Sequence, residues 1–311
     1  SPGDIIKKHG AEVMRLWVAA SPYESDIRLS EGILTALGND YKKVRNTLKY
    51  ALSNLFDFDP AQDAVGVDQL LPLDGWVLGA HESVIEKVTQ AYEKFEFHLV
   101  FQTVVDFCSN ELSAQYFDIQ KDALYTSKKG GLKRRSAQTT LYRIVKELLV
   151  MLAPVTSFTC EEAYEFLPGK KELSVFLEPF PRPVAVAGRA STSAPEIEAL
   201  LAVRASVLPL LEIARRDKLI GKSLEAQVVL CATGATGELL EKYAQQLPEL
   251  FIVSQVHLAR LADEKSTQIM EGVKAQVTQA TGNKCPRCWT YRTEVGVQEL
   301  CARCTEAQGT S

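Results

Sequence analysis

The sequence lacks several features that would assign a function directly. It has only three methionines and four histidines in 311 residues. No apolar run reaches the roughly 18 residues that cross a bilayer. The N-terminus also lacks the basic and then apolar pattern of a signal peptide. These absences argue against an integral membrane protein and an exported protein, so we expect a soluble chain in the cytoplasm.

Positive charge is not in excess, because 35 Lys and Arg face 39 Asp and Glu, for a net charge of −4. This balance excludes a histone-like nucleic-acid binder, although a local basic face remains possible. With 46% hydrophobic and 24% charged residues the chain has an ordinary globular composition. Its length predicts two or three domains. Since it opens on Ser1 rather than methionine, we expect a piece of a longer protein.

Motifs for catalysis are missing as well. We find no Gly-rich phosphate loop, no G-x-S-x-G and no H-E-x-x-H. The four histidines share no spacing with carboxylates or cysteines. The sequence therefore predicts no catalytic residue.

The pattern from about residue 31 to 167 is helical. Apolar residues at spacings of three and four, such as Val44, Leu48 and Leu52, form one stripe. Similar stripes predict helices over about 72–95, 97–112 and 132–152. Thr159 and Glu162 have capping-box spacing, which predicts that a short helix starts there. Long helices with short turns are typical of an antiparallel bundle.

The C-terminal half has a different organisation. Four prolines between 179 and 195 predict a linker. Beyond it we expect a helix over 197–219, a strand over 226–231, a helix over 237–246 and an extended segment over 250–256. The fold class is thus mainly α: an antiparallel helical bundle, then a small α/β module, then a four-cysteine zinc finger. The predicted parts are 1–30 (a mixed segment with strand-like alternation at 26–29), 31–178 (bundle), 179–195 (linker), 196–265 (α/β module) and 266–311 (zinc segment).

Four of the seven cysteines lie within twenty residues. They form two C-x2-C knuckles, Cys285 with Cys288 and Cys301 with Cys304. Two such pairs match the tetrahedral thiolate coordination of Zn²⁺, and they leave no open position for catalysis. We predict one structural zinc ion. An iron-loaded thiolate site and an oxidised form without metal are the alternatives.

Cations and aromatic rings accompany the knuckles. Arg287 and Trp289 lie at the first knuckle, and a ring beside guanidinium groups suits stacking on single-stranded RNA. The alternative is that these cations only balance the thiolate charge. We predict that Arg287 and Trp289 contact RNA.

Two further basic groups occur in the helical region. Lys42, Arg45 and Lys49 line one side of a helix whose other side is apolar. Lys133, Arg134 and Arg135 follow a Gly-Gly turn at a predicted helix start, where free backbone N–H groups also favour phosphate. Most such stripes are simply solvated, but with the zinc segment they make three positive sites on an acidic chain.

Several segments, taken in order, resemble one family, the class I aminoacyl-tRNA synthetases of the isoleucyl, valyl and leucyl group. The last two segments are similar to the zinc tail of the bacterial isoleucyl type. The segments are GAEVMRLWVA (10–19), RNT (45–47), FCSNEL (107–112), RSAQTTL (135–141), IGKSLEA (220–226), KCPRCW (284–289) and LCARC (300–304).

The resemblance implies the C-terminal part of such an enzyme, without its catalytic and editing domains. It implies that the chain holds tRNA(Ile), that Asn46 joins the RNA-contacting residues, and that the catalytic domain of the same enzyme is a partner. No membrane or DNA partner is expected, and the chain alone should not activate isoleucine. A valyl or leucyl relative is one alternative. A zinc-finger DNA glycosylase of the formamidopyrimidine type is another, against which the long helical bundle argues.

Overall fold

The computed structural model describes residues 1–21, 29–184, 189–260, 264–296 and 299–309. They gather into two compact units. One comprises 1–118 with 135–192, and the other comprises 119–134 with 193–311. The segment 119–134, which we expected within the bundle, thus belongs with the C-terminal part of the chain. No helix in the described part of the chain combines the length and apolar character needed to span a bilayer.

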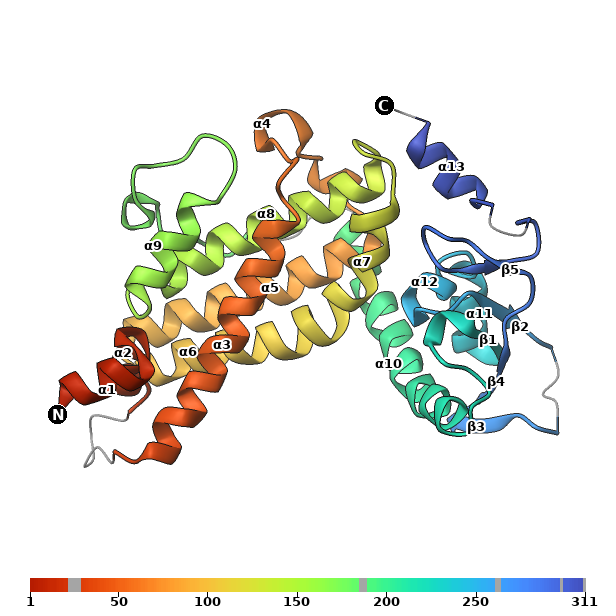
Figure 1. Ribbon diagram of the computed structural model, residues 1–311, viewed down its shortest axis with the longest axis horizontal. Coiled ribbons are helices and arrows are strands. Elements are labelled where there is room, and N and C mark those ends of the chain that lie inside the picture. The colour runs from red at the N-terminus through yellow and green to blue at the C-terminus, as the bar shows by residue number, and fades with distance from the viewer. Residues whose placement is uncertain (22–28, 185–188, 261–263, 297–298, 310–311) are drawn as a thin grey trace. The chain divides into compact units, whose positions relative to one another are not determined.

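The first unit is helical (Figure 1). α5 and α6 are joined by the short connection 94–96 and pack against each other, as neighbouring helices of an antiparallel bundle do. Its elements are α1 (Pro2–His9), α2 (Ala11–Ala20), α3 (Glu31–Ser53), α4 (Pro60–Asp63), α5 (Pro72–Glu93), α6 (Phe97–Phe107), the π-helix η2 (Cys108–Tyr116), the start of α7 (Phe117–Thr126), most of α8 (Leu132–Leu152) and α9 (Ser157–Glu165).

The long helices agree with the sequence pattern. Ser30 caps α3, since its side chain accepts the N–H of Ile33 at 3.2 Å. α8 ends at Leu152, ahead of Pro154, as expected from the missing N–H of proline. The residues that define the stripes, among them Val44, Leu48 and Leu148, are almost fully buried. The predicted helical bundle is confirmed.

The N-terminal segment and the start of α9 differ from expectation. Residues 1–20 form two helices, and the strand expected at 26–29 lies mostly outside the described residues. α9 begins at Ser157, two residues before the predicted capping box. The carboxylate of Glu12, on α2, accepts the backbone N–H groups of Phe158 and Thr159 at 2.7 and 2.9 Å. A distant side chain therefore satisfies the helix start, which a local motif could not reveal.

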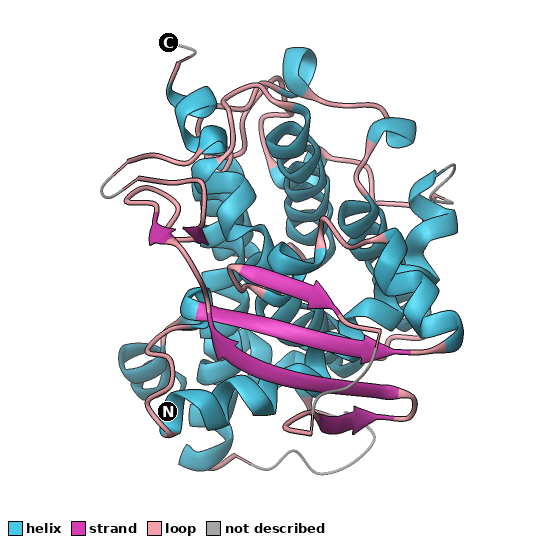
Figure 2. Cartoon of the chain, turned by 90° about the vertical axis from the view of Figure 1, so that its right-hand side faces the viewer, coloured by secondary structure: helices cyan, strands magenta, loops and turns pink. Residues whose placement is uncertain are grey.

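The second unit holds a four-stranded sheet in the order β2-β1-β4-β3 (Figure 2). β1 and β2 are parallel and are joined through two helices, as a parallel pair requires. β4 runs antiparallel to β1 over seven residue pairs. The elements are most of α10 (Arg189–Arg216), β1 (Ala226–Ala232), α11 (Gly234–Lys242), α12 (Leu247–Phe251), β2 (Gln255–Leu258), β3 (Thr267–Met270), β4 (Val273–Gln279), β5 (Asn283–Lys284), β6 (Tyr291–Arg292) and α13 (Ala302–Gln308).

Two predictions for this unit are wrong in part. The linker does not extend to 195, because α10 starts at Arg189 and contains Pro195. The buried face that follows, with Ile197 and Leu200, supplies packing that offsets the lost hydrogen bond. Residues 247–251 are helical rather than extended. Pro248 suits a first helical turn, and Ile252, with φ 57°, ends it.

Strands β3 and β4 were not predicted. Val273, Ala275 and Val277 alternate with polar residues, and the first two are fully buried. That alternation was readable as a half-buried strand.

Candidate metal centre and nucleic-acid interface

The four predicted cysteine ligands come together at one point of the second unit. One Sγ atom from each of Cys285, Cys288, Cys301 and Cys304 lies within 4.8 Å of every other, and all four residues are buried. The first knuckle is closed by the Trp289 N–H, which donates to the carbonyl of Cys285 at 2.9 Å. The second knuckle lies at the start of α13, where Cys301 is the N-cap residue.

This geometry fits a tetrahedral metal. Zn–S bonds of about 2.3 Å place neighbouring sulfurs about 3.8 Å apart, and Cys288 and Cys301 have Sγ atoms 3.7 Å apart. Burial alone would raise the pKa of the Cys285 thiol, but backbone N–H groups of Cys288, Cys301 and Arg287 lower it to about 6. Such N–H groups favour thiolate, which is the form that binds zinc.

Two arginines hold the zinc segment against the C-terminal end of α7, within the same unit. Arg287 donates to the carbonyl oxygens of Thr126 and Tyr125 and lies 3.6 Å from the Cys304 sulfur. Arg303 forms a two-pronged ion pair with Asp122, one prong of which is 2.9 Å. Carbonyls at a helix C-terminus carry partial negative charge, so they suit a guanidinium. Arg287 is thus engaged within the chain.

Trp289 projects from the knuckle, and its side chain is 53% exposed. Its backbone has φ 64°, a left-handed conformation that is strained for a bulky residue. Two ammonium groups face the ring: Lys222 Nζ is 5.4 Å from the ring centroid and Lys284 Nζ is 5.8 Å away. The result is an exposed aromatic platform with positive charge on it.

A second basic surface lies on α3, in the first unit. Lys42, Arg45, Asn46 and Lys49 are all exposed. Lys43, between them, is neutralised by Asp40 at 2.8 Å. By contrast, Lys42, Arg45 and Lys49 make no ion pair with any residue that the structure describes. We call the four exposed residues Lys42, Arg45, Asn46 and Lys49 the α3 face.

The third predicted basic group is divided by the fold. Arg135 is only 8% exposed, donates to the carbonyl of Asp57 and to Gln138, and pairs with Asp63 at 3.1 Å. It therefore has no free guanidinium to offer a phosphate. Lys133 pairs with Glu249, and Arg134 is half-buried and has a partner within the chain.

Comparison with known protein families decides the assignment. The family model of the anticodon-binding domain of tRNA ligases matches residues 74–230, about half of the chain. The chain belongs to this family. A second model, a zinc finger found in FPG and IleRS, matches residues 282–307, which include all four cysteines. This finger occurs both in FPG, the formamidopyrimidine-type DNA glycosylase, and in IleRS. The match to the anticodon-binding domain therefore distinguishes this chain from a DNA glycosylase.

Curated relatives of this anticodon-binding chain are isoleucine–tRNA ligases. That of Syntrophotalea carbinolica is 46% identical over 98% of this chain, and that of Symbiobacterium thermophilum is 43% identical over 97%. The ligase of Geobacter sulfurreducens is 41% identical over 99%. The chain spans about a third of the length of these relatives, namely 33%, 34% and 34%. The predicted resemblance to the isoleucyl type and the single structural zinc are confirmed.

Three contributors to these sites escaped the sequence analysis. Lys222 reaches Trp289 from a segment 67 positions earlier in the chain. Asp122 on α7 anchors the zinc segment through Arg303. No local signal marks either residue, because each acts across a tertiary contact. Phe166, the C-cap residue of α9, is the third: its ring is 69% exposed, which its apolar neighbours Leu167 and Pro168 do not indicate.

Proposed function

We propose that this chain binds the anticodon arm of tRNA(Ile), as the tRNA-binding C-terminal region of an isoleucine–tRNA ligase. In the complete enzyme it would orient the acceptor end of the tRNA toward a catalytic domain, in the cytoplasm, for ATP-dependent charging with isoleucine. The names of the relatives and the zinc-finger match support the isoleucyl type.

The observation that carries the proposal is the α3 face. The chain has a net negative charge, yet three cations on one helix are exposed and unpaired in the described structure. Cations left without internal partners suit phosphate oxygens, which dominate affinity for nucleic acids. Asn46 adds an amide that can hydrogen-bond to a sugar or a base edge.

The zinc segment supplies the second contact in this proposal. Trp289 is the stacking residue, and the ammonium groups of Lys222 and Lys284, which lie over its ring, are the cations nearest to a phosphate of the bound strand. Lys133 and Arg134 are weaker candidates because each already has a partner. Arg287 serves mainly to hold the segment, and Arg135 is left out of the proposed interface.

The test is a binding comparison at low salt between tRNA(Ile) and an unrelated tRNA of equal length. We expect tighter binding of tRNA(Ile), and binding of both to weaken steeply as salt rises. Equal affinity for the two would remove the isoleucine-specific part of the proposal. Absence of binding to either would overturn it.

A further inference from the structure

A groove lies between α3 and α9, inside the first unit. Its volume is about 500 Å³. The α3 side contributes Arg45, Lys49 and Leu52, and the α9 side contributes Glu162 and Phe166. The groove borders the α3 face, since Arg45 and Lys49 belong to both.

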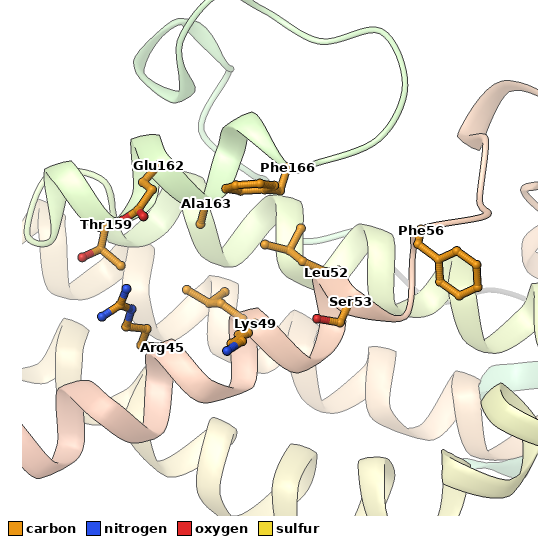
Figure 3. A pocket seen from close by; sticks show the side chains of 10 residues that line it. Arg45, Lys49, Leu52, Ser53, Phe56, Thr159, Glu162, Ala163 and Phe166 are labelled. Carbon is orange, nitrogen blue, oxygen red and sulfur yellow. The ribbon is translucent and has the colours of Figure 1, made fainter.

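The two walls of the groove differ in chemistry. In Figure 3, Arg45 and Lys49 project from α3, while the Phe166 ring lies along the α9 side of the groove, beside Ala163 and above Leu52. Phe166 is 69% exposed, although a phenyl ring in water is unfavourable. Glu162 is also exposed, and it forms no ion pair with any described residue.

The backbone that carries the Phe166 ring is held in place by Lys171. The ammonium of Lys171 donates to the carbonyls of Tyr164 and Glu165 at 2.6 Å each and to that of Leu167 at 2.9 Å. These contacts fix the last turn of α9, where Phe166 is the C-cap residue. Because this backbone is already ordered, only the side-chain torsions of Phe166 lose conformational entropy when a flat group stacks on its ring.

From this arrangement we infer that the groove binds one unstacked nucleotide of an RNA loop, with its base on Phe166 and its phosphate on Arg45 and Lys49. The inference rests on the proposed function and adds a second base-binding position to it. An aromatic ring opposite cations is the combination used by single-strand binding grooves. Glu162 repels phosphate, so it keeps the backbone on the α3 wall and leaves the α9 wall to the base. An acidic peptide would meet the same cations, but it would place carboxylates beside Glu162.

The test uses the whole chain and the anticodon stem-loop of tRNA(Ile), with 2-aminopurine placed at each loop position in turn. Binding should change the emission at the position that stacks on Phe166. Phe166→Ala should abolish that change and weaken binding roughly 5- to 150-fold, the range of a lost base–aromatic stack. The matched control is Phe158→Ala, because Phe158 is also on α9 and also 69% exposed but does not line the groove.

The outcomes separate the two proposals. If the unmodified chain does not bind the stem-loop, the proposed function fails and this inference fails with it. If the chain binds but Phe166→Ala behaves like Phe158→Ala, only the inference is overturned. Both phenylalanines are exposed, so circular dichroism should show both variants folded. Loss of binding specific to Phe166→Ala supports the groove as a base site.

Discussion

At the scale of single residues, the cysteine ligands are the most consequential side chains of the C-terminal segment. Among the residues that the structure describes here, the apolar cluster around them adds only Val295 and the partly buried Leu300. A cluster this small cannot stabilise a fold by burial alone, so the metal must supply the difference. Structural zinc contributes on the order of 10 kcal/mol of folding free energy in such segments.

Cys288→Ser should therefore release zinc and unfold residues 282–308 locally, while the bundle keeps its stability. Native mass spectrometry would report the metal, and hydrogen exchange would report where protection is lost. Cys231→Ser is the control, since Cys231 is not a ligand. Retained zinc in Cys288→Ser would contradict the assigned site.

A second single residue, Glu147, affects the stability of the fold at low pH. Burial alone would raise the pKa of its carboxyl, but the hydrogen bond from His81, at 2.9 Å, and the charge of Arg143 bring it below the usual 4.5. A folded-state pKa below the unfolded value means that the stabilisation is complete above about pH 4.5. It disappears as the pH falls through the lowered value.

Glu147→Gln should accordingly be less stable than the unmodified chain at pH 7 and should lose less stability on acidification. Urea unfolding at intervals from pH 7 to pH 3 measures both effects. Glu93→Gln, an exposed change on the same helix as His81, should leave the curve unaltered. Parallel curves for Glu147→Gln and the unmodified chain would show that this carboxylate does not contribute.

At the scale of elements, the contact between α2 and α9 shows how one helix fixes the start of another. Glu12 is only 8% exposed, and its carboxylate accepts two N–H groups from the first turn of α9. Arg15, one turn further along α2, donates to the carbonyls of Pro154 and Val155 at 2.9 and 3.0 Å. Glu12 and Arg15 thus fix the connection between α8 and α9. They also fix the start of α9, which forms one wall of the groove between α3 and α9.

Glu12→Ala should cost about 1–2 kcal/mol of unfolding free energy, as the loss of a helix cap does. It should also raise hydrogen exchange in the first turn of α9. Glu31→Ala is the comparison, because Glu31 pairs with Lys8 and His9 on the surface, where an ion pair contributes little to stability. Equal losses for the two variants would argue against the capping role.

At the scale of the whole molecule, the proposed affinity for RNA depends on where unpaired cations remain on an acidic chain. Lys49 and Lys43 lie on the same helix, but only Lys43 is neutralised, by Asp40. Lys49→Ala should reduce the slope of log affinity for tRNA(Ile) against log salt by about 1, as one lost phosphate contact does. Lys43→Ala should leave the slope nearly unchanged. Fluorescence anisotropy at several salt concentrations measures it, and equal slopes would remove Lys49 from the interface.

At the same scale, the fold decides which cations of one basic group can be tested for RNA contact. On sequence, Arg134 and Arg135 are equivalent cations of one patch. In the fold, Arg135 holds Asp57, Gln138 and Asp63 together. Its replacement would destabilise the bundle, so it cannot report on RNA contact.

The sequence by itself determined the helical bundle, because apolar residues at spacings of three and four suffice to select a helix and its buried face. It likewise determined the zinc site, because two C-x2-C pairs bring four thiolates together with little help from the rest of the chain. Tertiary structure alone decided that Glu12 starts α9, that β4 joins the sheet beside β1, that Lys222 faces Trp289, and that Arg135 is buried while Arg45 is exposed. Each of these depends on groups far apart in the chain, and no local pattern records which distant partner will satisfy a charge or a backbone N–H.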